Sequence, residues 1–513
     1  MVKQSINFDR SNLPQSVFNV KTVKELECKA IDTLGITMYE LMLRAGQACY
    51  ELARAQWPEA RHWLIACGHG NNGGDGYVIA RLAQAAGINI TLLSCNSSSN
   101  LVNQEANMAR NAWLSAGGMI YDPDIIWPEN IDLIIDALLG TGINRAPIAP
   151  YNHIINMINA HCAPVLAVDI PSGLMANNGI TPGVAVIANH TLSILALKPG
   201  QLIGKARDYV GVLHYHDLGL AILLTNIKAP IIRYSEQDLV RWIKPRRSSM
   251  HKGDNGRLLL IGGDLGTAGA IRMTAEAALR SGAGLVYVLT HENNVTPILT
   301  ARPELMVDIL NEKLLKKALA WADVIGIGPG LGQRKWGQKA LKIVSGNKNK
   351  KPMIWDADAL NWLARNHDNR QNRIITPHIG EAARLLNVSI SEIENDLIYS
   401  AKTLAQRYGG VIVLKGAGTV IVSETGNVVI IDVGNAGMAT AGMGDILSGI
   451  IASFLSQKLK LIEAAYAGCV VHGATADAVC HQRGMRGMLA TDLLKLMWQF
   501  VNPETEITEK FQI

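Results

Sequence analysis

Short apolar runs of strand length alternate with longer segments of helical periodicity along the whole chain. This alternation is typical of parallel β-sheets that helices cover on both faces. The 513 residues are about three times the commonest single-domain size, so more than one hydrophobic core is expected. We therefore predict an α/β protein with two domains, each built around a mainly parallel sheet.

The strand pattern weakens between Asp217 and Arg247, where Pro230 and Pro245 interrupt it, and it begins again near residue 258. We therefore place the domain boundary near Thr225, which gives domains 1–225 and 226–513. One or two helices are expected within residues 22–57. Strands are expected at residues 63–67, 90–93, 133–136, 165–169, 258–261, 285–289, 324–327, 353–355, 374–376, 411–414 and 420–422.

The charges are too balanced for a nucleic-acid-binding surface, since 48 Lys and Arg oppose 43 Asp and Glu, for a net charge of +5. The first ten residues lack the apolar core of a signal peptide, and polar residues interrupt the longest uncharged stretch, so no membrane span is expected. The seven cysteines form no C-x-x-C pair, which predicts free thiols in a reducing cytoplasm. The expected partners are small molecules.

A turn rich in Gly and Asn, residues 68–76, follows the first predicted strand and precedes a helix. Its glycines let the backbone approach a ligand, and the unpaired N–H groups at a helix start attract an anion such as pyrophosphate. Asn71 and Asn72 add side-chain carbonyl groups that suit a hard cation. A tight strand-to-helix turn without a ligand is the alternative.

Two predicted strands of the first half end in an aspartate. Asp136 precedes a second Gly-rich loop that carries Arg145, and Asp169 precedes Pro-Ser-Gly with Ser172. The carboxyl ends of neighbouring parallel strands face one crevice, so we expect Asn72, Asp136, Asp169 and Ser172 to converge there. One such aspartate could simply cap a turn, but two beside two Gly-rich loops indicate a site.

These three motifs, at 71–76, 136–145 and 168–173, resemble those of the YjeF N-terminal domain, a Rossmann-like fold that epimerises hydrated nicotinamide dinucleotides. The resemblance covers about residues 20–218. It implies that potassium is held by Asn72, Asp136 and Ser172. Epimerisation needs proton removal and return, for which a desolvated carboxylate is suited, and Asp169 is the candidate. The substrate would lie against Asn71, Asn72, Gly73, Gly74, Asp75, Gly140, Thr141, Gly142, Ile143, Asn144, Arg145, Ala146 and Asp169. The chain departs from the family after Ser-Gly-Leu, where Met175-Ala176-Asn177-Asn178 replaces the usual acidic residues.

A run of small residues in the second half, 435–445, precedes a helix predicted at 446–454. Small residues allow successive N–H groups to point into one concavity, which binds the charge that develops in phosphoryl transfer. Asp445 would stand at the mouth of this anion hole, where it could orient or deprotonate a hydroxyl group. The alternative is that Asp445 only caps the helix.

The strand predicted at 411–414 leads into Lys415-Gly416-Ala417-Gly418-Thr419, whose lysine and backbone could hold nucleotide phosphates. It is not a Walker A loop, which disfavours the P-loop class. A further Gly-rich loop at 326–332, Asp356, Asp358 and His378 follow strands at the same predicted edge. His378 could also serve only a turn.

The motifs 328–332, 415–419 and 442–445 resemble those of the YjeF C-terminal domain, a ribokinase-like sandwich that acts as an ADP- or ATP-dependent dehydratase of the hydrated S-epimer. The resemblance covers about residues 235–496 and implies Mg²⁺, with ADP preferred as in bacterial fusions. The implied nucleotide contacts are Lys415, Gly416, Ala417, Gly418, Thr419 and Gly444. The implied contacts to the hydrated dinucleotide are Ala270, Gly330, His378 and Asp445, of which Asp445 would be catalytic.

We predict a bifunctional repair enzyme that interconverts the R and S hydrates of NADH and NADPH (NADHX and NADPHX) and dehydrates the S form with ADP, yielding AMP and phosphate. One rival is a small-molecule kinase built on the second domain. Another is a first domain that only senses a dinucleotide or RNA. His214 and His216 lack a third ligand, so a solvent-facing strand is expected rather than zinc. A symmetric homo-oligomer is the default expectation.

Overall fold

The computed structural model describes residues 10, 12–95, 103–225, 227–347 and 350–504. The chain forms two compact units, residues 1–232 and 233–513, and the boundary near Thr225 stays a prediction. Within the described ranges, no helix combines the length and the apolar character needed to cross a bilayer.

The first unit contains a parallel sheet of six strands in the order β3-β2-β4-β5-β6-β7. These strands are β2 (His62–Cys67), β3 (Asn89–Ser94), β4 (Leu133–Ala137), β5 (Val165–Val168), β6 (His190–Ile194) and β7 (Val212–His216). The four strands predicted between residues 63 and 169 are confirmed. The pattern did not predict β6, because Thr191 and Ser193 interrupt its apolar residues. A short antiparallel pair, β1 (Ser16–Val17) and β8 (Ile231–Tyr234), joins Val17 to Ile231.

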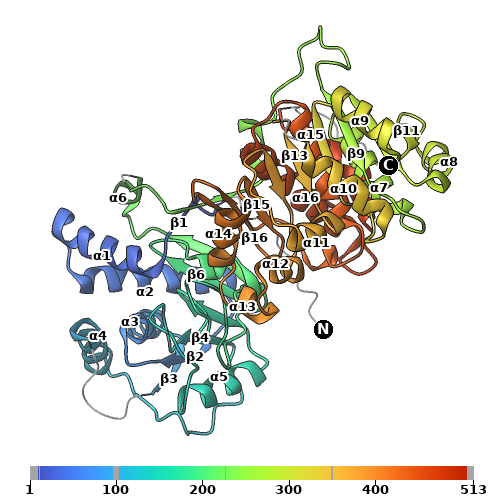
Figure 1. Ribbon diagram of the computed structural model, residues 1–513. Helices are drawn as coiled ribbons and strands as arrows, with labels where there is room; N and C mark the ends of the chain where they lie inside the picture. The colour runs from blue at the N-terminus through green and yellow to red at the C-terminus, as the bar shows by residue number, and fades with distance from the viewer. Residues whose placement is uncertain (1–9, 11, 96–102, 226, 348–349, 505–513) are drawn as a thin grey trace. The chain divides into compact units, whose positions relative to one another are not determined.

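Helices cover both faces of this first sheet. They are α1 (Val20–Leu34), α2 (Met38–Gln56), α3 (Asn71–Ala85), α4 (Gln104–Ser115), α5 (Tyr151–Ala160), α6 (Ala221–Thr225), and the 3-10 helices η1 (Pro199–Gln201) and η2 (Gly204–Asp208). Because successive strand residues point to opposite faces, Trp63 and Ile65 of β2 pack with α2, α3 and α4, whereas Leu64 and Ala66 pack with α5. Figure 1 shows these helices around the strands of the sheet. The two helices expected within residues 22–57 are α1 and α2.

The second unit is built on strands in the order β17-β16-β15-β14-β13-β12-β9-β10-β11. These are β9 (Arg257–Ile261), β10 (Leu285–Thr290), β11 (Met306–Ile309), β12 (Val324–Ile327), β13 (Met353–Trp355), β14 (Arg373–Ile375), β15 (Val411–Leu414), β16 (Thr419–Ser423) and β17 (Val428–Ile431). Neighbours from β14 to β11 pair in parallel, as do β14 and β15, while β15, β16 and β17 pair antiparallel. The seven strands predicted in this half are present, and β11 and β17 are additional.

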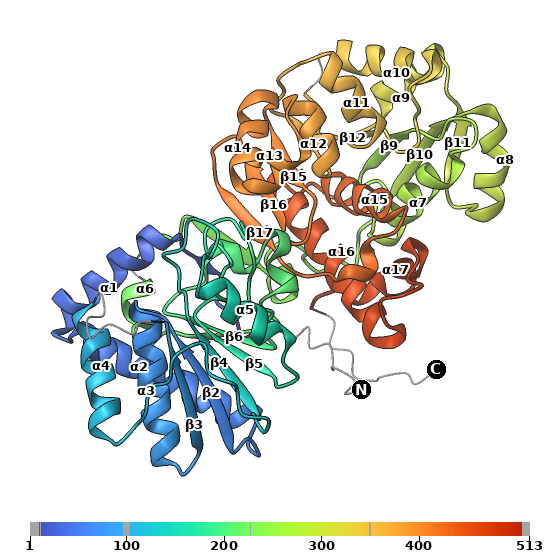
Figure 2. The ribbon, with the colours of Figure 1, turned by 90° about the horizontal axis from the view of Figure 1, so that it is seen from below.

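The second sheet also lies between two layers of helices. They are η3 (Glu236–Arg241), α7 (Ala268–Arg280), α8 (Glu292–Ala301), α9 (Glu312–Trp321), α10 (Lys335–Gly346), α11 (Asp358–Arg365), α12 (Ile379–Leu386), α13 (Ile390–Asn395), α14 (Leu397–Tyr408), η4 (Ala436–Met438), α15 (Met443–Ser456), α16 (Leu461–Arg483), α17 (Ala490–Leu496) and η5 (Met497–Gln499). Figure 2 shows α7, α15 and α16 on one face and α9, α10 and α11 on the other. This is the layered α/β architecture predicted for a ribokinase-like unit.

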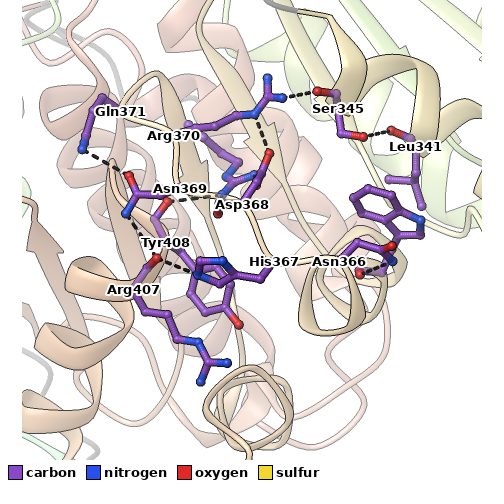
Figure 3. A network of polar contacts seen from close by, with 12 residues as sticks. Leu341, Ser345, Asn366, His367, Asp368, Asn369, Arg370, Gln371, Arg407 and Tyr408 are labelled. Carbon is purple, nitrogen blue, oxygen red and sulfur yellow. Dashed lines mark hydrogen bonds and ion pairs between the residues drawn. The ribbon is translucent and has the colours of Figure 1, made fainter.

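A polar network fixes the loop between α11 and β14 at the amino end of the strand. Arg370 donates hydrogen bonds to the Asp368 carboxylate and to the backbone carbonyl of Ser345 (Figure 3). The same carboxylate accepts a 2.6 Å hydrogen bond from Arg373, whose side chain is 0% exposed and whose guanidinium lies 4.8 Å from the Trp355 ring centroid. Asp368 therefore neutralises a fully buried cation.

Replacing Asp368 with Asn should lower the local stability of the second unit by about 3 kcal/mol, because it leaves the buried Arg373 guanidinium without its counter-charge. Hydrogen exchange of β14 amides measures the loss. The matched control is Asp323→Asn, since Asp323 and Arg257 form an ion pair in which both side chains are 44% exposed, and its loss should cost below about 1 kcal/mol. Equal effects of the two variants would contradict the assigned role of Asp368.

Candidate active sites

The first unit contains a cavity of about 890 Å³. Its walls contain most of the residues predicted to bind the substrate, which come from the start of α3, the loop after β4 and the end of β5. These are Asn71, Asn72, Asp75, Gly140, Thr141, Gly142, Ile143, Asn144, Arg145, Ala146 and Asp169. The loop 140–146 is mostly exposed and forms part of the rim. Of the four residues predicted to converge, Asn72 and Asp169 line this cavity, whereas Asp136 and Ser172 are not among its lining residues.

The Gly/Asn segment differs from its prediction in one respect, because residues 71–76 are helical and only residues 68–70 form a loop. Helix α3 begins at Asn71, after Gly70, and no side chain caps its first N–H groups. Gly73 and Gly74 do not line the cavity but allow the helix start to pack closely. A Cβ at Gly73 would lie 2.0 Å from the carbonyl oxygen of Gly68, and one at Gly74 would lie 2.5 Å from the Met42 methyl carbon.

Asp136 and Ser172 form a buried oxygen cluster beside this cavity. Ser172 donates from its hydroxyl to Oδ1 of Asp136 at 2.6 Å and from its backbone N–H to Oδ2 at 2.8 Å. Burial raises the pKa of Asp136 to about 6 despite these hydrogen bonds, and no ion pair reaches it from the described residues. The Ser172 hydroxyl also contacts the backbone of Leu139, next to Gly140, which in turn packs against Asn72.

Asp169 occupies a left-handed backbone conformation, with φ of 63°, at the turn that follows β5. Its carboxylate pairs with Lys198, whose side chain is 0% exposed, and accepts a 3.0 Å hydrogen bond from the N–H of Ile194. Gln201 donates to the Asp169 carbonyl at 2.7 Å. The strained turn is therefore held on three sides, and the carboxylate stays at the cavity wall. The motif search did not find Lys198, although a lone lysine within an apolar stretch was a usable signal.

Helix α1 contributes a third carboxyl group to the cavity. Val23, Lys24 and Glu27 line it, together with Asp75 and Asp169. Burial, and then the charge of Asp169, raises the pKa of Glu27, while burial raises the pKa of Asp75 well above its usual range. Sequence reasoning missed Glu27, because a glutamate on an amphipathic helix carries no local motif.

In the second unit, Lys415 lies in a buried acidic setting at the carboxyl ends of β13, β14 and β15. Its Nζ is 3.0 Å from Oδ1 of Asp356 and 3.9 Å from Oε2 of Glu381. Ser448 of α15 donates to the other oxygen of Asp356 at 2.7 Å. Burial lowers the pKa of Lys415, but the two carboxylates outweigh it, so the net shift is upward. Asp356, which the sequence predicted only to lie at this edge of the sheet, thus orients Lys415.

Asp445 stands in the first turn of α15 and does not cap the helix, because the N-cap is Gly442, with φ of 89°. This excludes the capping alternative. A Cβ on Gly444 would lie 3.3 Å from Nζ of Lys415, so the predicted nucleotide loop and the helix start are in contact. Burial, and then the carboxylate of Asp356, raises the pKa of Asp445 to about 7 against the effect of Lys415.

Ala270 and Gly330 also lie together, on α7 and on the loop after β12. A Cβ on Gly330 would be 3.1 Å from Cβ of Ala270, and the Thr267 hydroxyl donates to the Gly330 carbonyl at 2.7 Å. One turn further along α7, Met273 packs against Gly442 at the start of α15. Ala270 therefore lies on the helix that packs against the Asp445 turn, and Gly330 lies beside Ala270.

His378 has a local structural role, which agrees with the alternative interpretation that it serves only the chain next to it. It is the N-cap of α12, where its Nδ1 accepts from the N–H of Gly380 at 3.0 Å. Its side chain remains 54% exposed at the sheet edge that carries Lys415. In the predicted nucleotide loop, Gly416 and Ala417 are exposed, Gly418 is buried with φ of 79°, and Thr419 begins β16.

Other predicted features fall outside both sites. All seven cysteines are free. The strand predicted around His214 is β7, but His214 is half-buried and stacks on His190 of β6 at 5.0 Å between ring centroids, so it does not simply face solvent. Among the described residues, no group of three or more His, Cys, Asp or Glu side chains is placed to hold a metal ion.

Comparisons with known proteins assign each half to a family. Residues 38–200 match the family of the YjeF-related protein N-terminus, and residues 258–498 match the family of NAD(P)H-hydrate dehydratase. The chain is 57% identical, over 499 residues, to the bifunctional NAD(P)H-hydrate repair enzyme Nnr of Escherichia coli strain K12, covering 97% of this chain and 96% of that protein. The corresponding protein of Vibrio cholerae is 41% identical, with 96% and 99% covered. A ribokinase-like superfamily protein from Enterococcus faecalis V583 superposes with a TM-score of 0.50 at 32% identity, over 54% of this chain and 97% of that one.

Proposed function

Because the chain belongs to the family of bifunctional NAD(P)H-hydrate repair enzymes, we propose a division of labour between its two units. The first unit epimerises the R and S hydrates of NADH and NADPH. The second unit dehydrates the S-epimer and consumes ADP, which becomes AMP and phosphate. The observation that carries this proposal is the pair of sites, one around Asp169 and one around Asp445, each in its own unit.

The cavity of the first unit suits a hydrated dinucleotide. The uncapped start of α3 offers N–H groups to a phosphate, and Arg145 on the rim supplies a cation. Asp169 lies on the wall of the same cavity, held by Lys198, and is proposed to move the proton of the ring hydroxyl. Gly73 and Gly74 act indirectly, by letting the helix start approach its neighbours.

The oxygen cluster next to this cavity fits potassium. Asp136 and Ser172 supply a carboxylate and a hydroxyl, and Asn72 supplies an amide, which are all hard oxygen donors. The buried Asp136 lacks a cationic partner among the described side chains, and a monovalent ion would neutralise it. Potassium bound there would hold the loops after β4 and β5 together and would leave the proton transfer to Asp169.

Potassium should raise the thermal midpoint of the first unit relative to choline at equal ionic strength. At about 100 times its Kd, a ligand that binds only the folded state contributes about 2.7 kcal/mol. The variant Asp136→Asn should lose this shift, whereas Asp124→Asn, an exposed aspartate, should keep it. Differential scanning calorimetry measures the shift, and equal midpoints of the unmodified protein in both salts would refute the potassium site.

In the second unit, Asp445 would accept the proton of the ring hydroxyl as the hydroxyl oxygen attacks the β-phosphorus of ADP. AMP leaves, and the phosphate then departs from the ring carbon with the C–O bond electrons while loss of a neighbouring ring proton restores the double bond. Lys415, Gly416 and Gly444 would hold the phosphates. Mg²⁺ fits this site chiefly through nucleotide phosphates and water, since no described group of three or more His, Cys, Asp or Glu side chains could enclose it.

An assay of absorbance recovery at the reduced-nicotinamide band tests the whole proposal. The full chain receives a mixture of R and S hydrates with ADP, and in a parallel arm with ATP. We expect recovery of both epimers, with one ADP consumed for each dinucleotide restored. A stable phosphorylated product would favour the small-molecule kinase, and binding without recovery would favour a dinucleotide sensor. Faster recovery with ATP would overturn the preference for ADP.

A further inference from the structure

The cavity of the first unit has an acidic group on a helix that lies outside the family match. Glu27 belongs to α1, whereas the matched region begins at residue 38. We propose that Glu27 is the second proton-transfer residue of epimerisation, acting together with Asp169 from a different wall of the cavity. This inference rests on the epimerase function proposed for this unit.

Packing fixes the face that α1 turns to the cavity. Val23, Leu26 and Ala30 are buried in one core with α2 and with the segment after β6, as expected for an amphipathic helix with apolar residues three and four apart. The helix begins at Val20 and is capped by the Asn19 side chain. The N–H of Val20 donates to the Asn177 side chain at 2.9 Å. Asn177 lies in the loop that departs from the family pattern, so this loop anchors α1.

The same packing separates Glu27 from the other glutamate of the helix. Glu27 lines the cavity, whereas Glu25 is 61% exposed and pairs with Lys21 at the surface. The two residues have the same side chain on the same helix but face different surroundings. Glu25 is therefore a matched control for any substitution at Glu27.

The two carboxyl groups have different charged neighbours in this cavity. Burial and the charge of Asp169 raise the pKa of Glu27, while Lys198 and Lys24 oppose the shift. Asp75 of α3, the third acid that lines the cavity, is half-buried, and burial raises its pKa well above its usual range. Asp169 is paired with the buried ammonium group of Lys198. Two carboxyl groups in different electrostatic surroundings thus line one cavity, an arrangement that suits an acid and base pair.

The proposed step conserves atoms and charge. Glu27 gives its proton to the ring hydroxyl as the C–O bond breaks, water leaves, and the ring nitrogen lone pair forms a C=N⁺ bond. Water then attacks the opposite face of the ring carbon and loses a proton to Asp169, which forms the other epimer. Solvent returns the proton from Asp169 to Glu27, and in the reverse direction the two residues exchange roles.

The full chain tests this assignment, because each epimer reports on a different unit. With ADP, recovery from S-NADPHX requires only the dehydratase, whereas recovery from R-NADPHX also requires the epimerase. We expect Glu27→Gln to lower kcat for the R-epimer by about 100-fold or more, with KM little changed, while the S-epimer rate is retained. Glu25→Gln should leave both rates unchanged, and Glu27→Asp should restore part of the R-epimer rate. The baseline is Asp169→Asn, which reports uncatalysed epimerisation.

Two further measurements separate a chemical role from a structural one. The pH dependence of kcat/KM for the R-epimer should be bell-shaped, and Glu27→Gln should remove one limb of it. Epimerisation in H₂¹⁸O should place the label on the ring carbon. An unchanged R-epimer rate in Glu27→Gln, an equal loss in Glu25→Gln, or retention of the unlabelled hydroxyl would overturn the proposal. Failure of the unmodified protein to convert the R-epimer would instead refute the epimerase function, and this inference with it.

Discussion

Replacing Asp445 with Asn should lower kcat for ADP-dependent dehydration of the S-epimer by about 1,000-fold, within the range expected for loss of a general base. Asparagine keeps the size of the side chain but cannot accept the hydroxyl proton. Because Asp445 lies in the first turn of α15 beside Gly444 and Lys415, nucleotide binding should be largely retained. Steady-state kinetics with S-NADPHX, together with calorimetric titration of ADP, measure both quantities.

The control for this prediction is Asp323→Asn, which makes the same change at the opposite edge of the second sheet, before β12. It should leave kcat unchanged. The pH dependence provides a second check, because a base works only when ionised. With the pKa of Asp445 raised to about 7, kcat/KM of the unmodified protein should fall as the pH falls through that value. A nearly full rate in Asp445→Asn would remove Asp445 from the mechanism.

Replacing Asp169 with Asn should abolish enzymatic interconversion of the epimers, with a loss of about 1,000-fold. The change removes the proton acceptor and leaves the buried Lys198 without its counter-charge. The remaining walls of the cavity still offer the start of α3 and Arg145 to the dinucleotide, so binding should stay detectable. The R-epimer assay and the quenching of tryptophan fluorescence by NADPHX measure the two effects.

Two controls accompany Asp169→Asn. Asp124→Asn changes an exposed aspartate of the same unit and should leave the R-epimer rate intact. The S-epimer rate of Asp169→Asn should also match that of the unmodified protein, because dehydration takes place in the other unit. Full epimerase activity in Asp169→Asn would refute the assigned role, and loss of dinucleotide binding would show that Asp169 acts in binding.

Several site residues were predictable because they stand next to secondary-structure signals. Asp136 and Asp169 follow apolar runs, and in a parallel sheet the ends of such strands meet at one edge. The same reasoning placed Lys415 and Asp356 at one edge of the second sheet. The start of α3 was predicted wrongly as a loop, because five glycines between residues 68 and 76 lower helix propensity. Close packing against Gly68 and Met42 overrides that preference.

Other site residues were not predictable from local patterns. Glu27 and Lys198 each lie far from Asp169 in the sequence, and no spacing connects them to it. The capping role of His378 likewise depends on where α12 begins. Motif reasoning therefore found the backbone frame of each site and missed the groups that tune its charge.

The amino-acid sequence alone determined that this chain forms two α/β units, and that Gly-rich turns and strand-end carboxylates gather at one edge of each sheet. Hydrophobic periodicity and turn chemistry act over a few neighbouring residues, so they are readable along the chain. The tertiary structure decided which charged groups are buried together: Lys198 against Asp169, Lys415 between Asp356 and Glu381, and Glu27 at the cavity wall. A pKa depends on desolvation and on charges within a few ångströms, and only the folded packing of distant segments sets those.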